Sequence, residues 1–575
     1  MALVHRVNLS FNPLLGTYYY KCMINIKRLK TRYNMKAQPE AVHGKNSTLF
    51  PTFEQMITFR QHQAKRTALV KIETTDIAKD AEKFCNVYGK VLNTFVYCTK
   101  TGKNFLLVEY KTQDDVENLK RISVHMHSTG AVNVITPLLS YKLQHGIPVK
   151  HNNSSSTEYN KYLYTSFTVP PFTKIVQTLK QEKNVSRQMV LLYETLKVTD
   201  LDVRLRFFTA HQISFYLSKL FTNISVVPFG SSVNGFGQLG CDLDLLCRIE
   251  NNKAGSKIVW KKLTFLSQRL SLIERNEQKE FLQTISTIIE ACIPGMSNIK
   301  KVLEARVPIL KFFNGNTNMM CDLSCTNMVA LYMSELLFIY AELDSRVKPL
   351  VCTIRTWARN RNLTKETSGH WITNFSLTLL IIFYLQTKNI LPSLCLIESI
   401  TEENIKSQIL KPFSWFKKWK KSIGKGNTEN LHELLRGFFE YYSIFDFNTQ
   451  AICIREGIIK AKKNNSPLYI HNIFDTTLNV SKNVTVVELS RLINNFQSAL
   501  QILDSSEEDI IIKLIKLEPY ASQTEGTFKT IFLNGESHDN KQNENNSDMN
   551  DLKCINDEML TNEGNTNVHE NREKV

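Results

Sequence analysis

Two acidic residues separated by one apolar residue offer the clearest chemistry in this sequence. They are Asp242 and Asp244, on either side of Leu243. In a strand the side chains alternate between faces, so both carboxylates would point the same way while Leu243 points into the core. Carboxylates on one face repel each other unless a cation lies between them. Mg²⁺ fits this role, because it binds a few carboxylates together with phosphate oxygens and water.

A Gly-Ser turn precedes these acids by about ten residues. The apolar run that ends at Phe229 predicts a strand, and Gly230 allows the backbone to turn sharply there and to approach a ligand closely. Ser231 and Ser232 supply hydroxyls and backbone N–H groups that suit a phosphate. The spacing therefore predicts a phosphate site beside a metal site.

A third acid, Asp322, stands alone in the apolar stretch from Met319 to Leu323. An isolated Asp in a strand needs a reason, because burying an unpaired charge is costly. Metal coordination beside Asp242 and Asp244 provides one, since two ions held in this way can activate an attacking hydroxyl and stabilise a leaving pyrophosphate. A Gly-Ser pair or an Asp-x-Asp alone would carry little weight, but the combination with a later strand Asp is far more specific.

The elements that position these residues must form more than one domain, because 575 residues are too many for one compact core. The net charge is +17, and the segment 534–575 carries −6, which leaves +23 on the rest. A basic body suits nucleic acid or anionic lipid, although many basic proteins bind neither. The cysteines include no C-x-x-C pair and no completed zinc site. No apolar run is long enough to predict a membrane span.

The first forty residues contain no acid before Glu40. Basic residues among Leu, Ile, Val and Tyr are typical of a mitochondrial import segment, although serine is scarce here. The alternative is a basic arm that binds RNA. The basic residues are Arg6, Lys21, Lys27, Arg28, Lys30, Arg32 and Lys36.

Residues 67–137 show the order β-α-β-β-α-β of a small ferredoxin-like domain. The third expected strand resembles the RNA-contacting strand of an RNA-recognition motif, with Lys103 and Phe105 as candidate RNA contacts. Leu107 replaces an aromatic that would stack on a base, and the motif's glycine is missing. A packing or dimerisation module is therefore an equal alternative. The expected strands are 67–72, 91–99, 104–110 and 131–137, and the expected helices are 76–88 and 113–122.

The Gly-Ser turn with its three acids resembles the signature of the DNA polymerase β-like nucleotidyltransferase superfamily. Over roughly residues 170–500 the chain is similar to the noncanonical poly(A) polymerases and terminal uridylyltransferases, above all to their mitochondrial poly(A) polymerase branch. Two further runs carry the resemblance, Leu343 to Val347 and Trp371 to Leu377. The resemblance implies an α+β fold in which a nucleotidyltransferase palm, a mixed sheet with helices, is joined to a mostly helical central domain. A small ferredoxin-like, RNA-recognition-like domain would precede the palm.

This organisation predicts five parts along the chain. They are a mitochondrial transit segment at 1–44, a degenerate RNA-recognition-like domain at 65–145, a palm with its preceding helices at 170–328, a helical central domain with a poly(A) polymerase-associated segment at 329–515, and a disordered acidic, Asn-rich tail at 534–575.

The resemblance also implies an activity, namely template-independent transfer of AMP from ATP to the 3′ end of RNA with release of pyrophosphate. Asp242, Asp244 and Asp322 would be catalytic and would hold Mg²⁺ or Mn²⁺. A homodimer in the mitochondrial matrix, without a membrane span, is the implied setting. The implied nucleotide contacts are Gly230, Ser231, Ser232, Asn327, Ala330, Arg355, Arg359, Asn374 and Phe375.

Several of these assignments have alternatives. Arg355 and Arg359 share a helical face, which could equally be a solvated basic face. Met333 stands where similar uridylyltransferases have an asparagine that contacts sugar and base, so its presence favours ATP over UTP. A uridylyltransferase, a tailing enzyme of broad specificity, and an inactive RNA-binding scaffold remain open. Lys417 and Lys418, in a run of aromatic residues and lysines, are weak candidates for RNA contact, and a solvated loop is the alternative.

Overall fold

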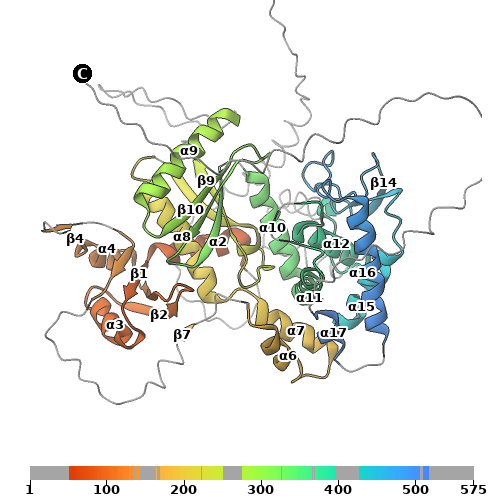
Figure 1. The fold of residues 1–575 in the computed structure, drawn as a ribbon, viewed down its shortest axis with the longest axis horizontal. Coiled ribbons are helices and arrows are strands. Elements are labelled where there is room, and N and C mark those ends of the chain that lie inside the picture. Colours follow the sequence, from red (N-terminus) through yellow and green to blue (C-terminus); the bar gives the residue numbers. More distant parts are fainter. Residues whose placement is uncertain are drawn as a thin grey trace, which may run out of the picture. The chain divides into compact units, whose positions relative to one another are not determined.

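The computed structural model of this protein (Figure 1) describes residues 51–127, 130–133, 136–142, 163–164, 169–221, 223–249, 275–325, 327–365, 367, 369–396, 426–505 and 509–516. The predictions for the leader 1–44, for Lys417 and Lys418, and for the tail 534–575 lie outside the described residues. All described residues belong to the unit formed by residues 1–518. Among the described helices, none is both long and apolar enough to cross a membrane.

The N-terminal domain is a sheet with the strand order β6-β1-β3-β2-β7. Helix α2 leads into it and begins at a capping box, in which Thr52 and Gln55 satisfy each other's backbone N–H groups. Helices α3 and α4 pack on one face over alternate residues such as Val70, Leu106 and Val108. The bounds are α2 Phe53–Lys65, β1 Thr67–Ile72, η1 Thr75–Ile77, α3 Ala78–Val87, β2 Val91–Cys98, β3 Asn104–Tyr110, α4 Gln113–Arg121, β6 Leu138–Ser140 and β7 Leu163–Tyr164.

The strand that closes this sheet differs from the expected one at 131–137. Strand β4, Val124–His127, pairs with β5, Gly130–Asn133, in a separate two-stranded sheet. The edge position beside β1 belongs to β6, which runs parallel to β1. A single helical crossover would have returned the chain parallel to β3 and antiparallel to β1, and the extra hairpin reverses it. The sequence pattern showed a strand here but not this reversal.

A second sheet, the palm, has the order β10-β11-β12-β9-β8, with β9 and β12 parallel. Alternate residues of its strands, such as Leu243, Leu245 and Leu323, face a core shared with helices α8 and α9. The opposite face carries Asp244 and Asp322. The bounds are α8 Asp200–Leu217, β8 Ile224–Phe229, η2 Gly230–Ser232, β9 Leu243–Ile249, α9 Arg275–Cys292, β10 Met296–Val302, β11 Ile309–Asn314 and β12 Met319–Ser324.

The remaining helices share one large core built around Trp357, Phe438, Phe439 and Phe496. The α+β fold expected from the sequence is confirmed. The bounds are α6 Phe172–Leu179, α7 Val185–Leu196, α10 Met328–Leu343, α11 Val347–Asn360, α12 Asn374–Thr387, α15 Leu431–Ser443, α16 Val486–Asp504 and α17 Ile510–Leu514, with a hairpin of β13 Gln450–Cys453 and β14 Ile458–Ala461.

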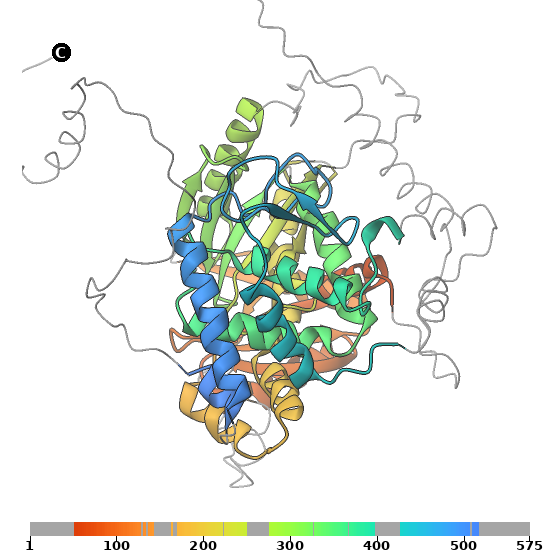
Figure 2. The same ribbon diagram turned by 90° about the vertical axis from the view of Figure 1, so that its right-hand side faces the viewer.

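Helices α6 and α7 belong to this helical core although they precede the palm in sequence. Ile175, Leu179 and Leu192 lie in the same cluster as Trp357, and Figure 2 shows these gold helices beside the blue C-terminal ones. The sequence predicts a palm with its preceding helices at 170–328, a grouping by chain order that stays a prediction. An amphipathic pattern shows that a helix has a buried face but not which core receives it.

The other face of the N-terminal sheet packs on the palm. Leu69, Tyr97, Phe105 and Leu107 lie in one core cluster with palm residues, and the Tyr97 hydroxyl donates to the Asn316 carbonyl at 2.8 Å. Phe105 is only 1% exposed, so it cannot stack on a base and the predicted RNA contact there is wrong. Phe105 supplies the aromatic side chain of the RNA-recognition motif, but its side of the sheet packs against the palm. Lys103 is exposed at the β2–β3 turn.

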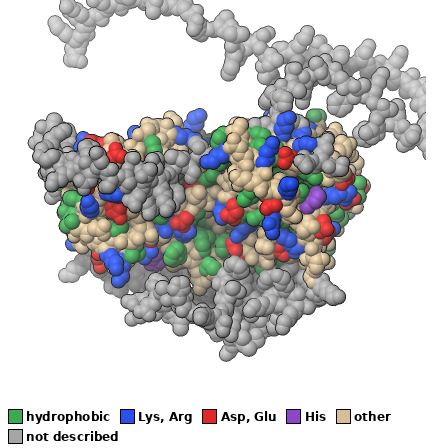
Figure 3. Space-filling view, turned by 90° about the horizontal axis from the view of Figure 1, so that it is seen from below, with side chains coloured by type: hydrophobic (Ala, Val, Ile, Leu, Met, Phe, Trp, Pro, Cys, Tyr) green, Lys and Arg blue, Asp and Glu red, His purple; other side chains and the backbone are tan. Residues whose placement is uncertain are grey.

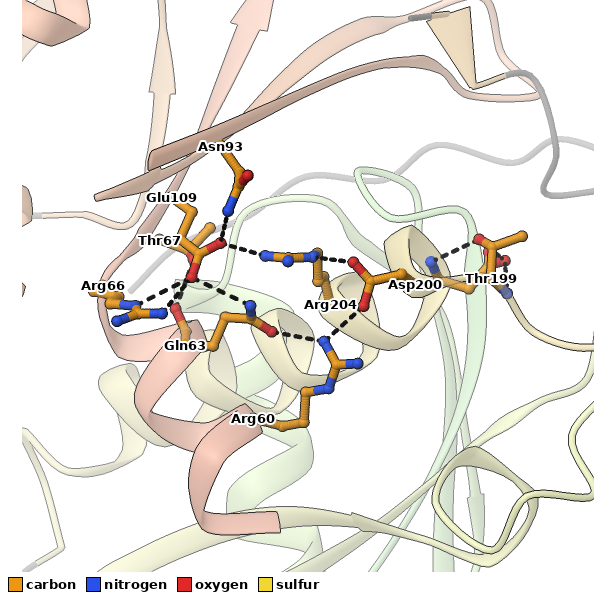
Figure 4. A network of polar contacts seen from close by, with 10 residues as sticks. Arg60, Gln63, Arg66, Thr67, Asn93, Glu109, Thr199, Asp200 and Arg204 are labelled. Carbon is orange, nitrogen blue, oxygen red and sulfur yellow. Dashed lines mark hydrogen bonds and ion pairs between the residues drawn. The ribbon is translucent and has the colours of Figure 1, made fainter. Parts of the chain in front are cut away.

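Figure 4 shows the polar contacts at this junction, centred on the buried Glu109 of β3. Its carboxylate accepts hydrogen bonds from Arg66 and Gln63 at the end of α2, from Asn93 of β2, and from Arg204 of α8. Arg204 also pairs with Asp200, 2.6 Å away, which is bound in turn by Arg60 of α2. Glu109 therefore connects strands β2 and β3 and helix α2 to α8, the first helix of the palm.

Candidate active site

Asp244 and Asp322 lie directly opposite each other on the parallel strands β9 and β12. Residues opposite each other on neighbouring strands share a face of the sheet, so both carboxylates point away from the core that holds Leu243 and Leu323. Asp242 lies one residue before β9 begins and is exposed. The sequence predicts that Asp242 and Asp244 share a face of one strand. The structure instead places Asp242 on the turn that enters β9, and the acid that shares the strand face with Asp244 is Asp322.

The electrostatics of this group depend on like charges held close together. Burial, together with the neighbouring carboxylates of Asp322 and Asp242, raises the pKa of Asp244 to about 7. The Oδ1 atom of Asp322 is buried and has no hydrogen-bond partner among the described residues. Its Oδ2 atom is 2.5 Å from the Nζ atom of Lys311, the residue opposite it on β11. A positive charge thus already lies against one of the three acids.

The side chains fit a divalent cation in chemistry but are not gathered around one. Among the residues that the structure describes, no three His, Cys, Asp or Glu side chains converge closely enough to hold a metal ion as they stand. Lys311 occupies an oxygen of Asp322 that a cation would need. The hard carboxylate oxygens of Asp242, Asp244 and Asp322 are nevertheless the ligands that Mg²⁺ and Mn²⁺ prefer. The metal assignment therefore stays a prediction.

The Gly-Ser turn packs directly on Asp244. Gly230 has φ +66°, and a Cβ atom there would lie 2.5 Å from Oδ2 of Asp244. Its N–H donates to the Ser334 hydroxyl of α10 at 2.7 Å, and that hydroxyl donates onward to the Ala330 carbonyl at 2.6 Å. Glycine is required for both the backbone conformation and the space. The contact with Ser334 ties the turn of the palm to the first turns of α10.

Arg206 of α8 holds the turn and the acids in register, a role that the sequence analysis missed. This buried guanidinium donates to the Ser232 hydroxyl at 2.8 Å, to the Asp242 carbonyl at 3.0 Å and to the Cys241 carbonyl at 2.7 Å. Ser232 therefore faces Arg206 and not a ligand. The signal that could have revealed Arg206 is its place within the apolar run from Leu205 to Phe208, where an arginine needs partners.

A cavity of about 440 Å³ opens beside the turn, a volume within the range of small-molecule sites. Eight residues predicted from the sequence line it, and of the remaining candidates Ser232, Arg359, Asp242 and Asp322 are not part of its lining. The eight are Gly230, Ser231, Asp244, Asn327, Ala330, Arg355, Asn374 and Phe375. Lining residues that the prediction did not include are Phe229, Asn234, Phe236, Val329, Ser334, Leu337, Thr378 and Asn472.

The two arginines of α11 have different surroundings. Arg355 lines the cavity and donates from Nη1 to the Phe236 carbonyl at 2.8 Å, while its buried Nε has no partner among the described residues. Burial, and then the charge of Arg359, lower the pKa of Arg355. Arg359 instead donates to the Gln238 side chain. Arg355 is therefore the arginine placed to meet an anion, and Arg359 supports the loop after the Gly-Ser turn.

Helices α10 and α12 direct their first turns at the cavity. The side chain of Asn327 caps α10 by accepting from the Ala330 N–H at 3.3 Å, and Asn374 and Phe375 form the start of α12. The positive ends of two helix dipoles favour an anionic ligand. Met333, on the next turn of α10, also lines the cavity and offers it no hydrogen bond.

Comparison with known proteins identifies the family of the chain. Residues 185–342 match the model of the central palm domain described as "Poly(A) RNA polymerase, mitochondrial-like", and residues 430–475 match that of the Cid1 family poly A polymerase. The mitochondrial poly(A) RNA polymerase of Mus musculus is 33% identical over 476 residues, which cover 81% of this chain and 79% of the relative. The Drosophila melanogaster protein of the same name is 30% identical over 490 residues, which cover 82% and 79%. The chain belongs to the mitochondrial poly(A) RNA polymerase family.

Solved structures support the assignment to the mitochondrial poly(A) RNA polymerase family. A crystal structure of mtPAP in complex with ATPγS superimposes with a TM-score of 0.70 and 29% identity, covering 81% of this chain and 100% of that one. A structure of mtPAP in complex with UTP has the same TM-score and 30% identity, with the same coverage. The solved structures and the relatives thus agree on the family of this chain.

Proposed function

We propose that this chain is a template-independent RNA nucleotidyltransferase that adds AMP from ATP to RNA 3′ ends. The observation that carries the proposal is the pair Asp244 and Asp322, opposite each other on one sheet face beside a cavity of nucleotide size. The poly(A) polymerase relatives support the same reaction. The apolar Met333 in the cavity supports ATP over UTP, because it cannot bond the groups that distinguish uracil.

Residues that line the cavity bind the nucleotide, and the aspartates beside it act on the reacting groups. The backbone N–H and hydroxyl of Ser231, with the guanidinium of Arg355, hold the triphosphate, and Phe375 stacks on the base. The O3′ atom of RNA bonds to the α-phosphorus of ATP, the bond from that phosphorus to the bridging oxygen breaks, and pyrophosphate leaves. Asp322 accepts the proton of the 3′-hydroxyl. Mg²⁺ or Mn²⁺ held by the three aspartates would offset the charge that develops on the reacting oxygens.

The setting of the reaction is part of the proposal. The relatives are named as mitochondrial, and the basic composition of residues 1–44 supports import into the matrix. A homodimer remains an expectation that light scattering of the full chain tests. Any dimer must use surfaces other than the buried sheet face around Phe105.

Asp244→Asn tests the assignment directly. This substitution keeps the volume of the side chain and removes the charge, so extension of RNA is expected to fall by about 10³-fold or more. RNA binding is expected to persist, and the thermal midpoint without metal is expected not to fall, because a repulsion between carboxylates is relieved. Asp114→Asn, on an exposed position of α4, is the matched control. Undiminished extension by the Asp244→Asn protein would refute the role.

A further inference from the structure

The path of RNA toward the site is not marked by the overall charge. On the face that Figure 3 shows, basic and acidic side chains are mixed and no single-sign patch stands out. The register of the palm sheet is more informative, because it fixes which side chains lie beside the catalytic carboxylates.

Four residues form a row across four neighbouring strands. Lys300 of β10 lies opposite Lys311 of β11, Lys311 opposite Asp322 of β12, and Asp322 opposite Asp244 of β9. Opposite residues share a face, so both lysines extend the carboxylate-bearing face toward the edge strand β10. Strands lie about 4.8 Å apart, which places Lys300 about 10 Å from Asp322 along the sheet. The row therefore runs from two aspartates to two lysines.

An apolar row lies beside the basic one. Phe313, two residues after Lys311 on β11, lies opposite Met320, two residues before Asp322 on β12. Both share the carboxylate-bearing face, since side chains two apart on a strand point the same way. Met320 is 42% exposed and Phe313 is partly exposed, so a ligand can reach both side chains. This face thus offers positive charges beside an exposed aromatic and thioether surface.

We propose that this face, defined by Lys300, Lys311, Phe313 and Met320, holds the last nucleotides of the RNA substrate. Single-stranded nucleic acid is bound by basic grooves that follow the phosphates and by aromatic side chains on which bases stack. A phosphate on Lys311 brings the RNA terminus beside Asp322, because the Lys311 Nζ atom lies 2.5 Å from that carboxylate. Lys300 takes a phosphate further from the end, and Phe313 with Met320 contacts a base. The inference rests on the proposed function and names its RNA subsite.

Lys300→Ala is the clean test, because Lys300 lies two strands away from the carboxylates whereas Lys311 touches one of them. Binding of labelled oligoadenylate RNA by the full chain is measured in EDTA, without nucleotide, across a salt series. Loss of one phosphate contact is expected to weaken binding several-fold at low salt and to reduce the salt slope by about 0.7. Phe313→Leu is expected to weaken binding about 5-fold or more with an unchanged slope, because stacking is not electrostatic.

Lys301→Ala is the matched control. Lys301 is the next residue of β10, is also exposed and carries the same charge, but it lies opposite the core residue Leu310 and so points from the other face. Its removal is expected to leave RNA binding unchanged. Equal affinity of the Lys300→Ala and wild-type proteins, or equal losses for Lys300→Ala and Lys301→Ala, would overturn the proposal. If the wild-type protein does not extend RNA with any nucleotide but Lys300→Ala still weakens RNA binding, the proposed function is rejected and this RNA-binding surface is kept. If the wild-type protein extends RNA with ATP but Lys300→Ala leaves RNA binding unchanged, the proposed function is kept and this surface is rejected.

Discussion

Arg206 shows how a residue outside the reaction can place the residues that react. Its guanidinium links the Ser232 hydroxyl with the carbonyls of Cys241 and Asp242, the two sides of the loop between the Gly-Ser turn and the acids. Arg206→Lys keeps the charge but cannot bridge all three groups. We expect kcat to fall about 10–100-fold with little change in the KM for ATP, because small misplacement of reacting groups is costly. Steady-state extension kinetics measure both.

Arg187→Lys controls for the substitution itself, since Arg187 of α7 is 77% exposed. It is expected to behave as wild type. An Arg206→Lys protein with wild-type kcat would show that the loop is held without the fork of the guanidinium.

Gly230 also positions a reacting residue without taking part in the reaction itself. Its φ of +66° is unfavourable for other residues, and a Cβ atom would press on Asp244. Gly230→Ala is therefore expected to reduce extension by about 100-fold or more, since it displaces a reacting carboxylate. Gly102→Ala is the control, because Gly102 has φ +76° but open space around it. That protein is expected to lose about 1 kcal/mol of stability and no activity. Equal activities in the extension assay would contradict the account.

For single residues, the sequence could predict those features that depend on the alternation of side chains along a strand and on the residue type at a turn. It predicted that Asp244 points away from the core side of its strand and that Gly230 makes the turn before it, whereas the pairing of Asp244 with Asp322 depends on the register of two strands. Helical spacing could not separate Arg355 from Arg359, since the difference lies in Phe236 and Gln238, which tertiary packing brings to α11.

The junction of elements around Glu109 gives a prediction for acid stability. Burial alone would raise the pKa of Glu109, but hydrogen bonds from Asn93 and Arg204 hold it below the usual value. The unfolded chain therefore takes up this proton at a higher pH than the folded chain does. The stabilisation is complete well above a pH of about 4.3 and is lost as the pH falls through the folded-state value.

Glu109→Gln is expected to lower stability at pH 7 by about 3 kcal/mol, because it leaves Arg204 without its buried partner. Its thermal midpoint is expected to fall less steeply below pH 5 than that of the wild type. Calorimetry across a pH series measures both effects. Glu304→Gln is the control, because the Glu304 side chain is 85% exposed where it pairs with Lys279, and this substitution is expected to leave the thermal midpoint almost unchanged. Parallel pH profiles for Glu109→Gln and wild type would reject the role of the network.

Among the elements, periodicity predicted most helices and strands of the N-terminal domain but not their partners. The hairpin of β4 and β5 turns the final strand around, so β6 joins β1 in parallel. The third strand kept Phe105 as an RNA-recognition motif would, yet its face packs on the palm. A pattern of exposed and buried positions cannot distinguish a surface that binds RNA from one that binds another domain.

Over the whole described chain, the cavity joins elements far apart in sequence. The Gly-Ser turn of the palm, the first turns of α10 and α12, and Asn472 near the hairpin all line it. The link from Gly230 to Ser334 binds the palm to the helical core at this point. Motif positions predicted eight of the lining residues, whereas Asn472 and Phe236 come from loops whose place depends on the complete fold.

The measurement that tests the central claim most directly is extension of a labelled RNA ending in oligoadenylate, by the full chain in Mg²⁺, with each of the four nucleoside triphosphates separately. The account predicts long products with ATP and much shorter ones with UTP, GTP or CTP. Preference for UTP would place the chain with the uridylyltransferases and contradict the role given to Met333. Failure to extend with any nucleotide, from protein that is folded and binds RNA, would contradict the proposed activity and leave an RNA-binding scaffold.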